Sequence, residues 1–305
     1  MENQMEMLSI STSPSNNEEP GTRSNNKNDE NDEQRSIDKS RDVNQRAAWN
    51  MLSTKICYLV SITNSINIGI VKEKLLRQNM IRGKHLFCHF ILQAQLTSSQ
   101  KTHVYATLVA VINLELPEIG ELVLNRFIMK FKSAYFEENY AAWFSCLIFI
   151  GHLINHSVAD EMLGVELLTL IFEQQTTFSF EIMRVAIQFL EICGKNISYV
   201  FQKWLTEILD KIHNFVNDKQ IDIEDRKCLN LRLSKLLNNQ FNPKYLDLVP
   251  PYACQTTHFS TLDSVENNES YTIGYRYDPE YESNEKKYIL ELQKYDDEEE
   301  SVDYY

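Results

Sequence analysis

The sequence has little glycine and proline and no long apolar run. Eight glycines and seven prolines occur among 305 residues, less than half of the ~12% that is ordinary in globular proteins. Sandwich and Rossmann folds need more glycine in their turns, so the shortage favours a helical protein. No apolar run approaches the ~20 residues of a membrane span, and the first residues lack the pattern of a secretory signal. We expect neither membrane insertion nor secretion.

Closely spaced cysteines are also missing. The chain has six cysteines, and no two lie closer than 26 residues. This spacing excludes the Cys-x-x-Cys pairs of zinc ribbons and thioredoxin-type sites. Without a secretory signal, the cysteines are expected to be reduced thiols of a nuclear or cytosolic protein.

Catalytic motifs are absent from the sequence. There is no phosphate-binding loop, dinucleotide fingerprint, zinc-protease motif or nucleophile elbow. His85, Cys88 and His89 fall within one helical turn, and His152 and His156 are four residues apart, but neither group has a further ligand nearby. We interpret both as packing or helix-end residues, and therefore predict no enzymatic activity, no cofactor and no metal.

The negative charge lies at the two ends of the chain. The net charge is −13; residues 1–44 carry 10 acids and 5 bases, and residues 262–305 carry 14 acids and 4 bases. The remaining 19 acids and 21 bases leave the middle at +2. A nearly neutral middle is not typical of a protein that holds nucleic acid by charge alone.

Apolar residues recur at three- and four-residue steps from about Gln45 to Phe241, as in amphipathic helices. Gly194 is a candidate helix stop. The points where this apolar pattern is interrupted predict ten helices. Taken in pairs, they form five hairpins of about 39 residues each, close to the ~40–47 residues of a HEAT or armadillo repeat. The fold class is therefore predicted to be all-α, a right-handed solenoid of about five HEAT-type hairpins; an irregular α-bundle is the alternative. The helices are expected at 46–62, 65–78, 83–97, 101–114, 117–132, 138–155, 159–173, 180–194, 197–216 and 222–239.

Four segments follow from these patterns. Residues 1–44 are polar and are predicted to be disordered, and residues 45–241 form the solenoid. Residues 242–290 make an irregular extension that packs on or near the solenoid. Residues 291–305 form an acidic tail.

Several runs resemble the nucampholin family of pre-mRNA-splicing factors, in its domain related to the middle domain of initiation factor 4G. The resemblance covers about residues 45–290, nearly all of the predicted ordered chain. The matching residues are Ile81-Arg82-Gly83, Gln93-Ala94-Gln95, Thr102 to Ala106 with Asn113, the runs 117–131, 152–173 and 185–194, Thr257-His258, and the run 278–288.

The resemblance implies a five-repeat HEAT solenoid, a nuclear location and membership of the spliceosome. It also implies binding of the DEAD-box helicase of the exon junction complex, without enzymatic activity. Members of the family carry a second helical domain after an acidic linker, whereas the given sequence ends at such a linker, Asp296 to Glu300. Functions that need the second domain are therefore not expected.

The first repeat departs from the family pattern. Members carry a Gly-Leu-Ile-Asn-Lys-like run that faces the helicase, and here Tyr58, Ser61 and Ile62 replace its glycine, asparagine and lysine. With Leu59 and Asn64 they form the expected partner contact. Losing polar partners costs ~1–3 kcal/mol apiece, so we predict weakened helicase binding. The alternatives are a co-adapted interface, or a Tyr58 that packs against the next repeat.

Two other functions also fit the sequence. One is a translation-side adaptor for a helicase like initiation factor 4A, and the other is a truncated decoy of the full-length splicing factor. RNA contact is a secondary possibility, with a solvated helix face as its alternative. The candidate basic residues for RNA contact are Lys72, Lys74, Arg77, Arg82 and Lys84.

Overall fold

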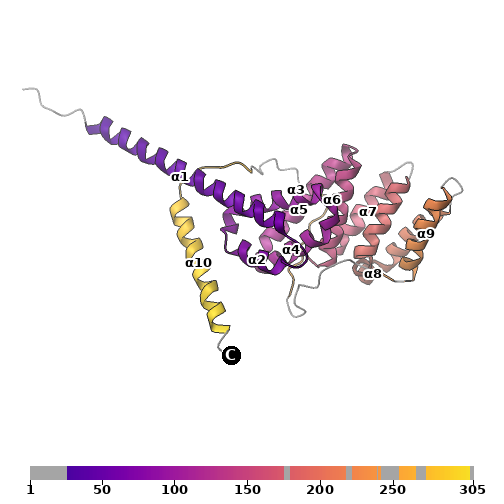
Figure 1. Cartoon of the computed structure of the whole chain (residues 1–305). Helices are drawn as coiled ribbons and strands as arrows, with labels where there is room; N and C mark the ends of the chain where they lie inside the picture. The colour runs from indigo at the N-terminus through magenta and orange to yellow at the C-terminus, as the bar shows by residue number, and fades with distance from the viewer. Residues whose placement is uncertain are drawn as a thin grey trace, which may run out of the picture. The chain divides into compact units, whose positions relative to one another are not determined.

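Ten α-helices and one short 3-10 helix make up the part of the chain that the structure, a computed structural model, describes (Figure 1). That part comprises residues 26–174, 179–217, 222–238, 240–241, 254–265 and 273–302, and no β-strand occurs within it. The helices are α1 (Asn26–Ile62), α2 (Ile68–Leu76), α3 (Met80–Thr97), η1 (Ser99–Lys101), α4 (Thr102–Glu115), α5 (Pro117–Phe136), α6 (Tyr140–Asn155), α7 (Glu161–Gln174), α8 (Phe180–Val216), α9 (Ile223–Leu237) and α10 (Tyr281–Val302).

The chain divides into two compact units, Met1–Gln45 and Arg46–Tyr305. Helix α1 begins at Asn26, so it starts well before the predicted onset of order at Gln45. The stretch from 26 to 45 contains no glycine or proline, which leaves helix formation unopposed by the two strongest breakers. Disorder before Asn26 stays a prediction, because residues 1–25 lie outside the described residues.

Helix starts follow the side chains that cap them. The side chains of Asn79, Asn139, Ser179 and Asp222 accept hydrogen bonds from the first turns of α3, α6, α8 and α9. Pro117 occupies the first turn of α5, which begins where the helix 117–132 was expected to begin. These local signals explain why sequence reasoning located most helix starts within a few residues.

Alternate helices pack on one another along the chain. Helix α2 contacts α4, α4 contacts α6, and α6 contacts α8, while α3 contacts α5. Sequential neighbours also pair, as in α5 with α6, α7 with α8 and α8 with α9. Because α4 and α6 have neighbours on several sides, they are buried almost all round. This stacking confirms the predicted all-α solenoid.

Helix α8 joins two of the predicted helices. It runs from Phe180 to Val216 and bends at Phe201, whose backbone angles are not helical (φ −122°, ψ 42°). The prediction that Gly194 ends a helix is wrong, because the helix continues through it. A Cβ on Gly194 would lie 2.8 Å from the ring of Phe241. The glycine thus permits close packing rather than helix termination.

No helix in the described ranges is both long and apolar enough to cross a lipid bilayer.

Candidate partner-binding surface

The predicted contact residues at the end of α1 fall on two sides of the helix. Leu59 is buried and Ile62 packs partly against the core. Tyr58 is 61% exposed, and Ser61 is also exposed and donates from its Oγ to the carbonyl of Tyr58 at 2.7 Å. Of the predicted contact residues in this helix, Tyr58 and Ser61 are therefore the two that are exposed to a partner.

Two asparagines hold the turn between α1 and α2. The Asn67 side chain donates to the carbonyl of Ile62 at 2.9 Å and accepts from the backbone N–H of Asn64 at 2.8 Å. The Asn64 side-chain oxygen accepts from the N–H of Ile66 at 2.9 Å. Asn64 is thus a turn residue as well as a candidate contact. The turn displays Ile66, which is 92% exposed and which sequence reasoning missed.

The five candidate RNA-contact residues do not share one environment. Lys72 forms an ion pair with Glu115 at 2.8 Å. Partial burial lowers the pKa of Lys72, but the hydrogen bonds and charges of Glu115 and Glu73 together outweigh burial and raise it. Lys74 and Arg77 are exposed on or next to α2, Lys84 is half-buried, and Arg82 is largely covered. RNA contact by this set stays a prediction.

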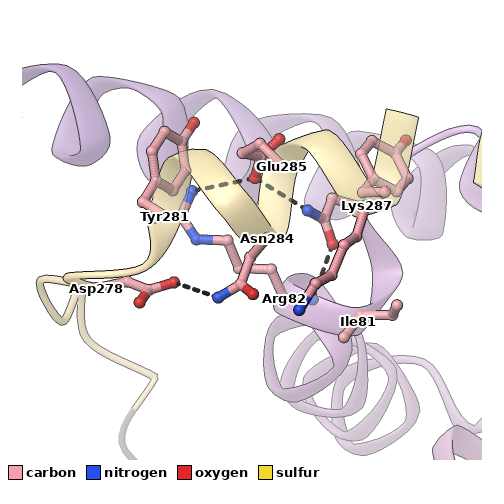
Figure 2. A pocket seen from close by; sticks show the side chains of 9 residues that line it. Ile81, Arg82, Asp278, Tyr281, Asn284, Glu285 and Lys287 are labelled. Atoms are coloured by element: carbon pink, nitrogen blue, oxygen red, sulfur yellow. Dashed lines mark hydrogen bonds and ion pairs between the residues drawn. The ribbon is translucent and has the colours of Figure 1, made fainter. Parts of the chain in front are cut away.

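Arg82 belongs to α3, and its side chain reaches toward the C-terminal helix α10 (Figure 2). Its guanidinium carbon stands 4.5 Å from the ring centre of Tyr281 and 5.6 Å from that of Trp49. One of its nitrogens is 3.8 Å from the carboxylate of Glu285, and Asn79 donates to the same carboxylate at 2.9 Å. The family-like runs at 81–83 and 278–288 therefore meet in the folded chain.

The second contact of α10 is made by Tyr288. Its hydroxyl donates to the carbonyl of Arg77 at 2.7 Å. Burial, together with the charge of Glu285, raises the pKa of Tyr288 to about 12. A cavity of about 320 Å³ remains between α10 and α3, lined by Asn79, Arg82 and residues of α10. The packing of α10 on α3 is therefore incomplete.

Residues 254–265, called here the extended segment, lie across the solenoid. Asn113 in α4 donates to the carbonyl of Thr256 at 2.8 Å and to the side chain of Gln255 at 3.0 Å. Its oxygen lies 2.7 Å from Nε2 of His258, so that nitrogen carries the proton and donates. Burial lowers the pKa of His258, and the charge of Glu121 opposes this in part.

Other bonds continue this attachment toward α5 and α7. The N–H of His258 donates to the carbonyl of Val158 at 2.9 Å. The ammonium of Lys132 donates to the carbonyls of Leu262 and Val265 at 2.7 and 3.2 Å. The N–H of Leu262 donates to Glu166 at 2.8 Å. The extended segment is thus held by side chains of three helices and by the α6–α7 turn.

The histidine groups singled out in the sequence show no metal-site geometry. Among the residues that the structure describes, no three His, Cys, Asp or Glu side chains gather closely enough to hold a metal ion. Burial, with smaller effects of His156 and His103, lowers the pKa of His152 to about 3, and burial raises the pKa of Cys88 to about 12. A neutral imidazole and a protonated thiol fit core packing.

Comparison with known proteins gives the family. The model of the MIF4G domain matches residues 83–244, more than half of the chain. The chain is 36% identical over 255 residues to a pre-mRNA-splicing factor CWC22 homolog of Drosophila melanogaster, and 35% identical over 255 residues to the CWC22 homolog of Danio rerio. It is also 35% identical over 255 residues to the male determiner protein Mdmd(II) of Musca domestica.

Each of these matches covers 82% of this chain, but only 19% of the Drosophila protein, 26% of the zebrafish protein and 21% of the Musca protein. With its helical solenoid and its matched residues, the chain belongs to the MIF4G domain family and is related to the CWC22 pre-mRNA-splicing factors.

Proposed function

We propose that the chain is a non-enzymatic scaffold in pre-mRNA splicing that acts in the nucleus as part of the spliceosome. The observation that carries this proposal is the 35–36% identity to CWC22 homologs over 82% of the chain. A stacked-helix domain exposes a long surface suited to protein partners. In this proposal its partners are spliceosomal proteins, with RNA as a secondary partner.

The finer part of the proposal concerns the helicase of the exon junction complex. The surface that would face it is the first repeat, at Tyr58, Ser61 and Ile62. Tyr58 projects into solvent rather than packing against the next repeat, so its ring would stand in the way of an approaching backbone. Ile62 offers no charge to a carboxylate. Helicase binding is therefore expected to be weakened.

The test compares the full chain with the triple variant Tyr58→Gly, Ser61→Asn, Ile62→Lys for binding to that helicase. Two or three restored polar contacts at ~1–3 kcal/mol each predict at least tenfold tighter binding by the variant. Tyr199→Gly is the matched control, because Tyr199 is likewise an exposed helical tyrosine (75%). Equal binding by the natural chain and the variant would contradict the weakened contact.

A separate measurement tests the splicing role itself. The full chain should co-purify with splicing proteins rather than with initiation factors; recovery with initiation factors would support the translation-side adaptor instead. A regulatory or decoy role is a second candidate, since a relative named a male determiner is as similar to this chain as the CWC22 homologs are. A dominant effect on splicing at raised dose would favour that candidate.

A further inference from the structure

The turn between α5 and α6 concentrates aromatic side chains. Five of the ten residues from 135 to 144 are aromatic, and their rings form one connected group. Ring centres are 4.1 to 6.1 Å apart along this group. The group, called here the aromatic tip, consists of Tyr135, Phe136, Tyr140, Trp143 and Phe144.

The aromatic tip has a buried base and an exposed face. Tyr135 and Trp143 are buried, with their ring centres 5.5 Å apart. Phe136 is 70% exposed and Tyr140 is 48% exposed, and each contacts one ring of the buried pair. Scattered exposed aromatics are ordinary, but exposed rings that are joined through one buried base are typical of a binding surface.

The backbone holds these rings in place. Glu138 has a positive φ of 54°, a left-handed conformation that is uncommon for residues other than glycine. The N–H of Asn139 donates to the carbonyl of Ala134 at 2.8 Å, and its side chain caps α6. The hydroxyl of Ser133 donates to Glu137 at 2.6 Å. The turn is therefore ordered before any partner arrives, which lowers the entropy cost of binding.

The charge beside the rings is negative. Glu137 and Glu138 are both exposed, and among the described residues neither forms an ion pair with a cation. Lys132, on the same helix, already donates to the carbonyls of Leu262 and Val265. An approaching ligand thus meets two carboxylates next to two exposed rings.

We propose that the aromatic tip, with Glu137 and Glu138, binds an arginine-containing segment of a protein partner. A guanidinium stacks on aromatic rings and pairs with carboxylates through a planar fork of donors, whereas a lysine ammonium lacks that plane. The two carboxylates repel phosphates, which disfavours RNA at this place. The site lies on α5 and α6, away in sequence from the first repeat, and does not depend on the helicase contact.

The test measures binding of a fluorescent peptide of five Gly-Arg repeats to the full chain at physiological salt, beside a peptide of five Gly-Lys repeats. The arginine peptide should bind several-fold tighter than the lysine peptide. The double variant Phe136→Ser, Tyr140→Ser should weaken arginine-peptide binding about tenfold. Glu137→Gln with Glu138→Asn should weaken it similarly and reduce its salt dependence, and asparagine tolerates the positive φ.

Tyr199→Ser is the control for loss of an exposed ring, and it should leave binding unchanged. Thermal unfolding of each variant checks the fold, and Phe136→Ser alone serves if the double variant unfolds, because Phe136 is largely solvent-exposed. If both peptides bind equally and the ring variants leave binding unchanged, the acidic ends of the chain bind any cation. That result would overturn the proposal. The proposal would also be overturned if single-stranded RNA displaced the peptide and the ring variants weakened RNA binding.

Discussion

The extended segment and α10 both follow the solenoid in sequence, but they attach to it in different ways. The extended segment places the buried His258 against the buried Asn113 of α4, and the two side chains form a hydrogen bond. Helix α10 attaches mainly through half-exposed Tyr281, Glu285 and Tyr288, beside a cavity of about 320 Å³. A buried polar group left without a partner costs far more than an exposed one, so the extended segment should resist opening much more than α10.

The strongest test of this comparison is Gly120→Ala. An added Cβ would overlap the side-chain oxygen of Asn113. The Asn113 side chain would have to move, and Thr256 and His258 would lose their hydrogen-bond partner. We expect a loss of about 2–5 kcal/mol in unfolding free energy, measured by denaturant unfolding, with faster hydrogen exchange at residues 254–260.

Gly69→Ala is the control for this change, because nothing lies within 4 Å of a Cβ at that helical position. It should stabilise the protein by about 0.5–1 kcal/mol through helix propensity. If Gly120→Ala were as harmless as the control, the Asn113 contacts would not be what holds the extended segment.

Acid should weaken the attachment of the extended segment but not that of α10, and the size of this effect should be intermediate. Because the pKa of His258 is lowered in the folded protein, the detached segment binds protons more readily once the pH falls below about 6.5. The attachment is therefore complete above pH 6.5 and weakens as the pH falls through the lowered pKa.

Hydrogen exchange at pH 7 and pH 5 can measure this change, after correction for intrinsic exchange rates. Residues 254–260 should lose protection at pH 5, whereas α10, which contains no histidine, should not. The variant His258→Gln should flatten the pH dependence. An unchanged pH dependence in that variant would assign the effect to other groups, such as His152.

The smallest expected effect belongs to Tyr288→Phe. It removes the hydroxyl that donates to the carbonyl of Arg77, but this contact is only half-buried, so the loss should be at most about 1 kcal/mol. Exchange in α10 should rise while the thermal midpoint of the solenoid stays unchanged. Loss of solenoid stability would show that α10 is part of the core, and would remove the contrast between the two segments.

Sequence reasoning predicted helices well and contacts poorly. The apolar steps of α5 and the position of Pro117 depend on neighbours within one or two turns, so they can be read locally. The bend at Phe201 escaped prediction because Gly194 looked like a stop, while its actual neighbour Phe241 lies 47 residues further along the chain.

The candidate partner-binding surface shows the same difference between local features and long-range contacts. The sequence left open whether Tyr58 meets a partner or packs against the next repeat, and the structure shows it exposed. The pairing of Lys72 with Glu115 and the covering of Arg82 by Tyr281 join residues 43 and 199 positions apart. Such pairings carry no local periodic signal. A basic cluster in sequence therefore need not become a basic patch in space.

The sequence by itself determined the helical class, the approximate helix starts and the neutral middle between acidic ends, because these depend on composition and on near neighbours. Only the tertiary structure decided that Asn113 meets His258, that Arg82 lies under α10 and that the rings of residues 135–144 form one connected group with an exposed face. The physical reason is that a helix period specifies which face is buried, whereas packing between distant helices specifies what that face, and the face left in solvent, will touch.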